Sequence, residues 1–365
     1  MFRYWIVFTL LFSWNSAFAV EVSDLYTAKV ALNSQTQRDQ SSALKAALKA
    51  VLVKIAGDEQ VLSNAFIKNE VQHYSKYLTQ FNYLTDNGVN NLVASFDENK
   101  INQLFFQENL PLWGKLRPLV LFWVVTEDGL KRRIISETDE SPLHDEISAL
   151  ATQKGLPVIL PLMDLTDTQN IQIPDLWGRF IDPIKLASQR YAPESVVIIR
   201  VSKNAIFTAD EEPTTDCNLL CKQSAISIDW HIVTTQSDKV ETGNQYKGVD
   251  ELVLMKTVMS DITTHISQRY SLTTETDHDL IIDVANIDSL AKYVDVTQFL
   301  DKLSVISSFK LIKAEGNNRR FELTLMGSAD TLFASLKLNN KLKQYVDPLS
   351  GQSADDIPVF FWGTE

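Results

Sequence analysis

The stretch Leu119-Val-Leu-Phe-Trp-Val-Val125 decides the fold, because all seven of its residues are apolar. Two shorter runs of the same kind follow at residues 158–162 and 196–199. Apolar runs without alternation are typical of strands covered on both faces, as in parallel sheets. Helical patterns at about residues 142–154 and 178–191 separate the three runs. The predicted order is therefore β-α-β-α-β, with right-handed crossovers.

Local signals mark the ends of these elements. Ser141 and Pro142 are typical of the N-cap and first turn of a helix, and Gly155 is typical of its end. Apolar and polar residues alternate over residues 226–232, which predicts a half-solvated antiparallel strand near a sheet edge. A closing helix is expected at residues 252–266. We therefore expect residues 113–272 to form an α/β domain with a central parallel sheet.

The preceding residues 20–112 read as an N-terminal α+β segment. Its first helix shows apolar residues at helical spacing, and its last helix begins at a favourable N-cap residue. The predicted elements are a strand at 22–32, a helix ending at Gly57, a helix at 66–81, a strand at 91–96 and a helix capped by Asp97.

The last third of the chain has the order β-α-β-β-α-β over residues 278–347, which is the ferredoxin-like pattern. The stretch Glu315-Gly-Asn-Asn318 is typical of the hairpin turn between its second and third strands. The tail at residues 348–365 is polar except for Pro358-Val-Phe-Phe-Trp362. We expect that apolar stretch to dock on the body of the protein.

Residues 1–19 have the three regions of a secretory signal peptide. Arg3 supplies the positive charge, residues 6–14 the apolar core, and Ala17-Phe-Ala19 the small-residue cleavage site. A membrane anchor is the alternative, but the apolar stretch is too short for a hydrocarbon layer of about 30 Å. Val20 is not Cys, so no lipid anchor is expected. The predicted location is the periplasm, after cleavage between Ala19 and Val20.

Composition excludes several classes of protein. The chain has 365 residues, 45% of them hydrophobic, which is unlike a disordered protein. Its net charge of −12 argues against a nucleic-acid partner, which needs a basic stripe. No later run approaches the ~18 apolar residues of a spanning helix, so we expect no membrane span in the mature chain.

Cys217 and Cys221 are the two cysteines of the chain. An exported protein meets an oxidising compartment, in which nearby cysteines can pair. Their C-x-x-x-C spacing differs from the C-x-x-C of redox enzymes. A local disulfide is the prediction, with free thiols and a chemical role as alternatives.

The sequence lacks the common catalytic motifs. None of the 12 glycines is spaced for a dinucleotide fingerprint or a nucleophile elbow, and none of the five histidines for H-E-x-x-H zinc binding. A Ser-His-Asp triad whose members meet only in space stays open. We therefore expect no cofactor, no metal ion and no catalysis.

Carboxylates follow two of the predicted strands. Glu127 and Asp128 come after the first strand, and Asp164 and Asp167 after the second. Open α/β sheets bind ligands beyond the carboxyl ends of their strands. These four residues are therefore a candidate rim for a cation, a cationic ligand or a partner. The alternative is a solvated acidic edge, which the net charge also explains.

Several stretches of the chain match a family pattern. They are Leu110-Pro-Leu-Trp-Gly-Lys-Leu-Arg-Pro-Leu-Val-Leu-Phe-Trp123, residues 155–164, Asp175-Leu-Trp-Gly178, residues 190–197, residues 51–57 and residues 61–64. Together they resemble the DUF2066 family of exported envelope proteins from Gram-negative bacteria. The resemblance implies a periplasmic protein and supplies no activity. The middle segment is also similar, at the level of fold, to the N-terminal α/β domain of TolB.

These observations favour a periplasmic accessory or adaptor protein that acts by binding another envelope protein. A small-ligand or polymer-binding protein and an enzyme with a dispersed site are the alternatives. A deep pocket with converging polar groups would favour the alternatives. A large exposed apolar patch would favour the adaptor. The sequence does not specify the partner or the oligomeric state.

The export prediction is tested by mass spectrometry of the protein from a periplasmic extract. Because the signal peptidase cuts after the small-residue motif, the N-terminal peptide should begin at Val20. A protein that keeps Met1 and fractionates with membranes would contradict the prediction.

Overall fold

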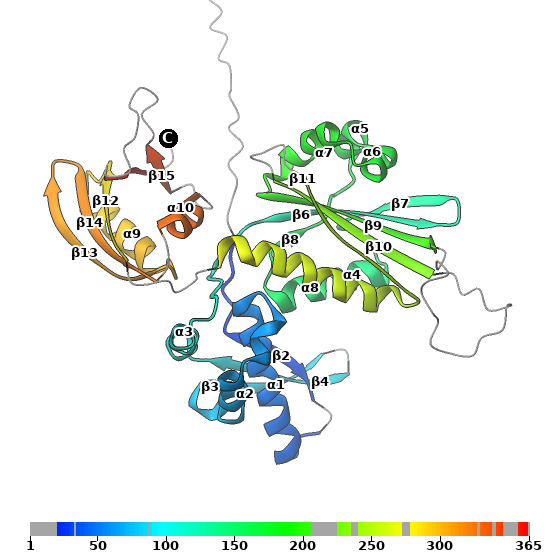
Figure 1. The fold of residues 1–365 in the computed structure, drawn as a ribbon, viewed down its shortest axis with the longest axis horizontal. Helices are drawn as coiled ribbons and strands as arrows, with labels where there is room; N and C mark the ends of the chain where they lie inside the picture. Colours follow the sequence, from blue (N-terminus) through cyan, green and yellow to red (C-terminus); the bar gives the residue numbers. More distant parts are fainter. Residues whose placement is uncertain are drawn as a thin grey trace, which may run out of the picture.

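The computed structural model describes residues 20–32, 34–86, 88–205, 225–234, 240–271, 278–326, 329–337, 341–345 and 357–363. The fold class is α/β plus α+β, as predicted. Figure 1 shows an N-terminal part in blue, a middle part in green and a C-terminal part in orange. Within the described residues, no helix is both long enough and apolar enough to cross a membrane.

The middle part is built on one mixed sheet with the order β11-β10-β9-β6-β7, in which β8 also pairs with β6. The strands β8 and β9 run parallel to β6, which confirms the three predicted parallel strands. The pairs β6–β7, β9–β10 and β10–β11 are antiparallel. The strands are β6 (Val120–Asp128), β7 (Lys131–Ile135), β8 (Val158–Ile159), β9 (Ser195–Ala205), β10 (Ala225–Thr234) and β11 (Val240–Gly248).

Helices cover both faces of this sheet (Figure 1). One face packs against α4 (Pro142–Lys154) and α8 (Glu251–Tyr270), and the other against α5 (Leu165–Asn170), α6 (Ile173–Gly178) and α7 (Ile181–Ser188). Adjacent residues of β6 therefore enter different cores: Phe122 faces α4 and α8, whereas Trp123 faces α5–α7. The Trp123 Nε1 donates a hydrogen bond of 2.9 Å to Ser188 Oγ.

The predicted caps of α4 are confirmed. The Ser141 hydroxyl accepts from a backbone N–H at the start of the helix, Pro142 occupies the first turn, and Gly155 ends the helix at φ +62°. The helix predicted at 178–191 is shorter in the structure, in which α7 covers only Ile181–Ser188. The helices α5 and α6 were missed, since six residues are too few to show an apolar stripe.

The N-terminal part has a three-stranded antiparallel sheet in the order β2-β4-β3, packed against helices. Its elements are β1 (Val20–Glu21), β2 (Thr27–Ala31), α1 (Gln37–Ala56), the 3₁₀ turns Glu59–Ser63 and Tyr74–Lys76, α2 (Ala65–Gln72), β3 (Leu78–Asp86), β4 (Val89–Phe96), α3 (Glu98–Gln107) and β5 (Leu116–Arg117). As predicted, Gly57 ends α1 and Asp97 caps α3.

The predicted helix at 66–81 is wrong beyond Gln72. The chain leaves α2 there and forms strand β3, which pairs with β4. The physical reason is the aromatic and β-branched content of Leu78-Thr-Gln-Phe-Asn-Tyr83, which favours a strand. Gly88, at φ +78°, lies in the turn between β3 and β4.

The C-terminal part follows the predicted βαββαβ order but adds a strand. Its elements are β12 (His278–Ala285), α9 (Leu290–Asp301), β13 (Ile306–Glu315), β14 (Asn318–Leu325), α10 (Ala329–Lys337), β15 (Leu342–Tyr345) and β16 (Val359–Trp362). The sheet order is β13-β14-β12-β16-β15. The apolar tail stretch therefore docks as β16, parallel to β12, and β15 becomes the edge strand.

A buried guanidinium joins the N-terminal and middle parts. Arg117 is fully buried, and its N–H groups donate to the carbonyls of Gly114, Trp113, Lys54, Lys154 and Gly155 at 2.7–3.1 Å. Its guanidinium carbon lies 3.9 Å from the centre of the buried Trp113 ring. Burial lowers the pKa of Arg117 to about 9. The carbonyls of Lys54 and Lys154 belong to the last turns of α1 and α4, so one side chain fixes both helix ends.

Replacing this group should destabilise the protein strongly. Arg117→Met leaves buried carbonyls without donors, which should cost about 3–5 kcal/mol of unfolding free energy. Arg38→Met is the matched control, because Arg38 is exposed on α1 and should change stability by about 0.5 kcal/mol or less. Urea unfolding measures both variants. Equal midpoints for the two variants would refute the role assigned to Arg117.

Candidate functional site

The carboxyl ends of β6 and β9 lie side by side at one end of the middle sheet, the position at which open α/β sheets bind ligands. Glu127 of β6 accepts a hydrogen bond of 2.9 Å from the Ser202 hydroxyl of β9. It also pairs with Arg132 of β7, with the shorter nitrogen–oxygen distance 2.7 Å. The structure therefore places Glu127 at the predicted rim, in contact with an arginine.

Three arginine side chains lie close together near this end of the sheet. We call Arg132, Arg179 and Arg200 the arginine rim. Two of them lie over the ring of Trp177 in α6, Arg132 at 4.1 Å and Arg200 at 5.4 Å from a guanidinium carbon to the ring centre. Arg200 also donates to the Trp177 carbonyl at 2.8 Å. These contacts attach the end of α6 to the sheet.

Asp229 of β10 is the shared acceptor of the arginine rim. Arg200 donates to both of its carboxylate oxygens, at 3.0 and 2.9 Å. Arg179 forms an ion pair with the same carboxylate. Arg179 follows α6 at φ +59°, a left-handed conformation that is uncommon for a residue with a side chain. Such strain persists only where surrounding contacts fix it, and here the ion pair with Asp229 does so.

His231 lies two residues after Asp229 on the same face of β10 and is 6% exposed. Burial lowers its pKa to about 4, and the charge of Arg179 contributes in the same direction. Its Nδ1 lies 4.0 Å from the Asp229 carboxylate, too far for a hydrogen bond. Among the described residues, neither this Nδ1 nor the buried Nε of Arg179 has a hydrogen-bond partner.

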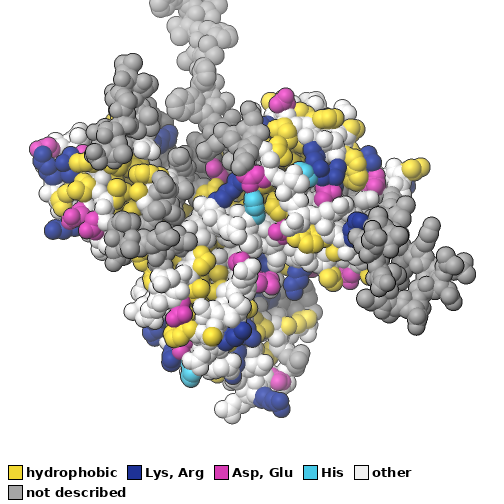
Figure 2. Space-filling view, viewed as in Figure 1, with side chains coloured by type: hydrophobic (Ala, Val, Ile, Leu, Met, Phe, Trp, Pro, Cys, Tyr) yellow, Lys and Arg dark blue, Asp and Glu magenta, His cyan; other side chains and the backbone are white. Residues whose placement is uncertain are grey.

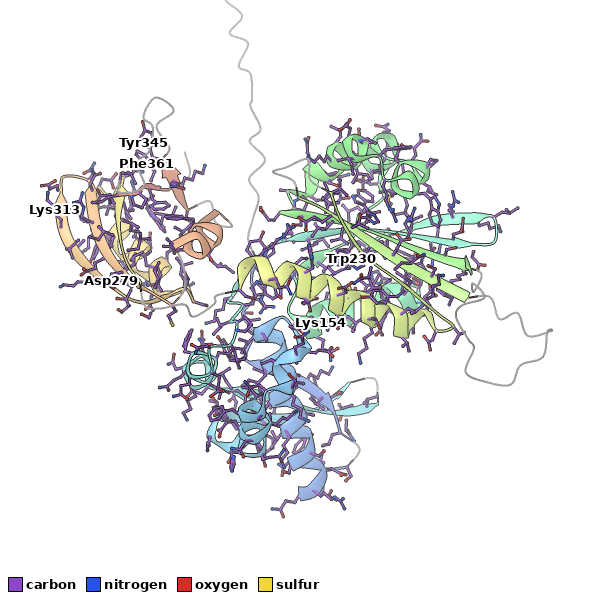
Figure 3. All side chains as sticks on the ribbon, in the orientation of Figure 1. Lys154, Trp230, Asp279, Lys313, Tyr345 and Phe361 are labelled. Atoms are coloured by element: carbon purple, nitrogen blue, oxygen red, sulfur yellow. The ribbon has the colours of Figure 1, made fainter. Side chains whose placement is uncertain are left out.

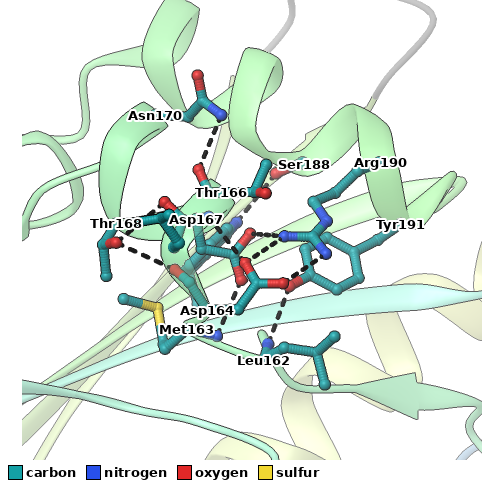
Figure 4. A network of polar contacts seen from close by, with 12 residues as sticks. Leu162, Met163, Asp164, Thr166, Asp167, Thr168, Asn170, Ser188, Arg190 and Tyr191 are labelled. Atoms are coloured by element: carbon teal, nitrogen blue, oxygen red, sulfur yellow. Dashed lines mark hydrogen bonds and ion pairs between the residues drawn. The ribbon is translucent and has the colours of Figure 1, made fainter.

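The second predicted pair of carboxylates does not join the arginine rim. Asp164 caps α5 and accepts from Arg190 at 2.6 and 2.9 Å (Figure 4). Asp167 is buried and accepts from Arg190 at 3.0 Å, from Tyr191 OH at 2.5 Å and from the Met163 backbone N–H at 2.8 Å. The Arg190 guanidinium holds the pKa of Asp164 at about 2. These carboxylates therefore bind internal donors and fix α5.

The remaining predicted site residues lie apart from these contacts or outside the described residues. Asp128 is exposed at the end of β6, where its backbone pairs with that of Lys131. Cys217, Cys221 and Ala19 lie outside the described residues, and Val20 is the first described residue, in β1. Among the residues that the structure describes, no three His, Cys, Asp or Glu side chains are grouped so that they could hold a metal ion.

Sequence reasoning missed the arginine rim because it followed acidic residues. One signal was present: Arg200 is the charged residue that directly follows the apolar run at 196–199, and it lies within β9. Another was the Lys131-Arg-Arg133 run close after the first strand. The partner Asp229 could not be paired with Arg200 from sequence, since the antiparallel register sets their contact.

Large apolar side chains are exposed over the adjoining helices. We call this group the helical-layer patch; its members are Leu162, Leu165, Phe180 and Leu186, with 47%, 73%, 56% and 58% of their surface exposed. Figure 2 shows yellow side chains on the visible side of the α5–α7 layer, with charged side chains between this layer and the sheet.

An open cavity of about 390 Å³ lies elsewhere, beside α4. It is lined by residues 22–24 of the N-terminal part and by residues at the end of α4 and the start of β8. Its carboxylates are Asp24 and Glu137. The backbone N–H of Glu137 donates to the Pro161 carbonyl, which ties this residue to the loop after β8.

Comparisons with known proteins supply no activity. A family model described as a domain of unknown function, DUF8605, matches residues 19–114, which is the N-terminal part. No curated protein matches the chain. The DUF2066 resemblance stays a prediction.

Two solved structures are similar to parts of the chain. A formyltetrahydrofolate deformylase from Pseudomonas putida is 12% identical, covers 53% of this chain and 83% of its own, and has a TM-score of 0.18. One from Burkholderia mallei is 15% identical, with coverage of 56% and 90% and a TM-score of 0.16. TM-scores this low carry no argument about fold or activity.

The burial of His231 predicts a pH dependence of stability. In the unfolded chain its pKa is about 6.5, so the unfolded state takes up a proton before the folded state does. Folding free energy should therefore be lost as pH falls from 6.5 to about 4, by at most about 3 kcal/mol. Urea unfolding at several pH values measures the slope.

His231→Gln is the informative variant, because its side chain does not titrate. It should flatten the stability profile in that pH window, whereas His73→Gln, at an exposed position, should not. A wild-type profile that is already flat from pH 6.5 to 4 would exclude a buried neutral His231.

Proposed function

We propose that this protein is an accessory or adaptor protein of the Gram-negative periplasm that binds another envelope protein. The helical-layer patch is the observation that carries the proposal. Single exposed apolar residues are common on protein surfaces, but here four large ones lie within residues 162–186, on the α5–α7 layer and just before it. Grouped apolar surface of this kind marks sites of protein–protein contact.

The surroundings of the patch support the same function. Protein interfaces combine an apolar centre with a polar border, and arginine and aromatic residues are enriched in them. Phe180, which is 56% exposed, directly follows Arg179 of the arginine rim in the chain. Leu165 follows Asp164 of the α5 network, which fixes the backbone that presents it.

The periplasmic location rests on the signal-peptide pattern of residues 1–19. Val20 and Glu21, the residues that follow the predicted cleavage site, belong to β1, which pairs with β5.

Site-specific photo-cross-linking in the living cell tests the proposal. A photoreactive amino acid at Leu165 should give a discrete adduct with a second protein, because this side chain is 73% exposed and belongs to the proposed contact. The same amino acid at Leu290, which is 77% exposed on α9, is the control and should not give that adduct.

A second substitution makes the test specific. Leu186→Asp should abolish the adduct at position 165, since a charge in an apolar interface loses its hydration without a partner. The melting temperature should stay within a few degrees, because Leu186 is exposed in the isolated protein. An adduct that persists in this variant, or the same adduct from position 290, would rule out the helical-layer patch as the docking surface.

A further inference from the structure

A second cavity, of about 220 Å³, lies where the N-terminal part meets the middle part. Its charged lining comes from three helices and a turn: Lys49 of α1, Lys154 of α4, Lys256 of α8 and Glu59 of the 3₁₀ turn after α1. Gln153 and the apolar side chains of Ala50, Val53 and Leu62 complete the lining. Figure 3 labels Lys154 at this junction, between α1 and α8. The cavity is therefore on the α4 and α8 side of the sheet, opposite to the helical-layer patch.

The charge of this cavity is opposite to that of the chain. Three lysines line it with one carboxylate, whereas the whole protein carries −12. A concave site in which one sign of charge is in excess concentrates the field and attracts ions of the other sign. The ligand that fits this lining is an anion.

Lys154 gives the cavity a fixed donor. The residue is 7% exposed, and its ammonium donates to Ser260 Oγ at 2.6 Å and to Glu59 Oε1 at 3.3 Å. Among the described residues these bonds use two of its three N–H groups. Burial lowers its pKa, and the charge of Lys256 acts in the same direction. An anion bound beside Lys154 would stabilise the charged ammonium and so raise its pKa again.

Glu59 is the internal competitor for that donor. Its side chain is 61% exposed, so it can turn toward water without losing buried contacts. Its carboxylate also accepts from Ser260 at 3.1 Å. A dianion, with twice the charge of one carboxylate, is therefore favoured over Glu59 at the Lys154 ammonium.

We infer that this cavity binds the phosphate group of a ligand, with Lys154 Nζ at its wall and Lys49 and Lys256 completing the positive lining. Lysine binds phosphate as a point charge, which suits three ammonium groups that come from separate helices. A water molecule occupies about 30 Å³ in the liquid, so the cavity has room for a phosphate group and several waters. The phosphate group belongs either to a small soluble ester or to an anionic lipid headgroup.

Calorimetric titration of the full mature chain tests this inference, with inorganic phosphate and glycerol 3-phosphate as soluble probes. Sedimentation with phosphatidylcholine vesicles, with and without phosphatidic acid, tests the lipid source. Saturable binding to the soluble probes assigns a free ester, and binding only to phosphatidic acid vesicles assigns a headgroup. Failure of all of these probes to bind overturns the inference.

The variants have effects of opposite sign. Lys256→Gln and Lys49→Gln should each weaken binding by about fivefold, because this is the contribution to affinity of one pair of opposite charges at close range in water. Lys68→Gln, at an exposed position on α2 outside the cavity, is the control and should have no effect. Glu59→Gln should strengthen binding, because it removes the carboxylate that competes for Lys154.

A purely structural role for the Lys154–Glu59 pair gives a different result. Glu59→Gln would then lower the melting temperature, and phosphate would not restore it. Equal affinities in the wild type and in the Lys49, Lys256 and Glu59 variants also overturn the inference. Both results leave the docking function untouched, since the helical-layer patch lies on the other face of the sheet.

Discussion

The buried guanidinium of Arg117 is the constraint on which the rest of the structure depends. It donates to five carbonyls, and two of these belong to the ends of α1 and α4. Helix C-termini carry partial negative charge, so the two helix ends together serve as its counter-ion. Because α1 belongs to the N-terminal part and α4 to the middle part, the position of the first part on the sheet is set by hydrogen-bond geometry. The lysine-lined cavity lies at the same junction of α1 and α4.

The two faces of the middle sheet are covered in different ways. On one face, α4 and α8 are long enough to bury continuous apolar stripes. On the other, three short helices bury fewer apolar residues, and polar contacts supplement them: Arg190 fixes α5, Arg200 fixes α6 and Ser188 attaches α7 to Trp123. Short helices have little inward surface, which leaves several large apolar residues of this layer exposed.

Much of the fold could be predicted from sequence because burial leaves local marks. The apolar run at 119–125 and the Ser141-Pro142 cap each report the environment of their own element. The alternation at 226–232 predicted a half-solvated strand and was wrong, because β10 lies between β9 and β11 and its polar residues Ser227 and His231 are buried. The prediction was wrong at residues 73–81, where aromatic residues suit a helix or a strand and only pairing with β4 decides. The arginine rim was missed for a related reason: Asp229 and Arg200 lie 29 residues apart, and the strand register brings them together. Four carboxylates were expected at one rim, but Asp164 and Asp167 bind Arg190 instead.

The parallel strand β16 has a consequence for the order of folding. It lies between β12 and β15, and its residue Val359 pairs with Asp283, more than 70 residues earlier in the chain. Contacts of such long sequence separation form slowly, because a large loop must close first. Until it closes, β12 has an unpaired edge, and Phe360 and Trp362, which are buried in the native state, remain in water. An unpaired edge is a template for strands of other chains, so chains in which β16 has not yet docked are exposed to aggregation and to chaperone capture at β12.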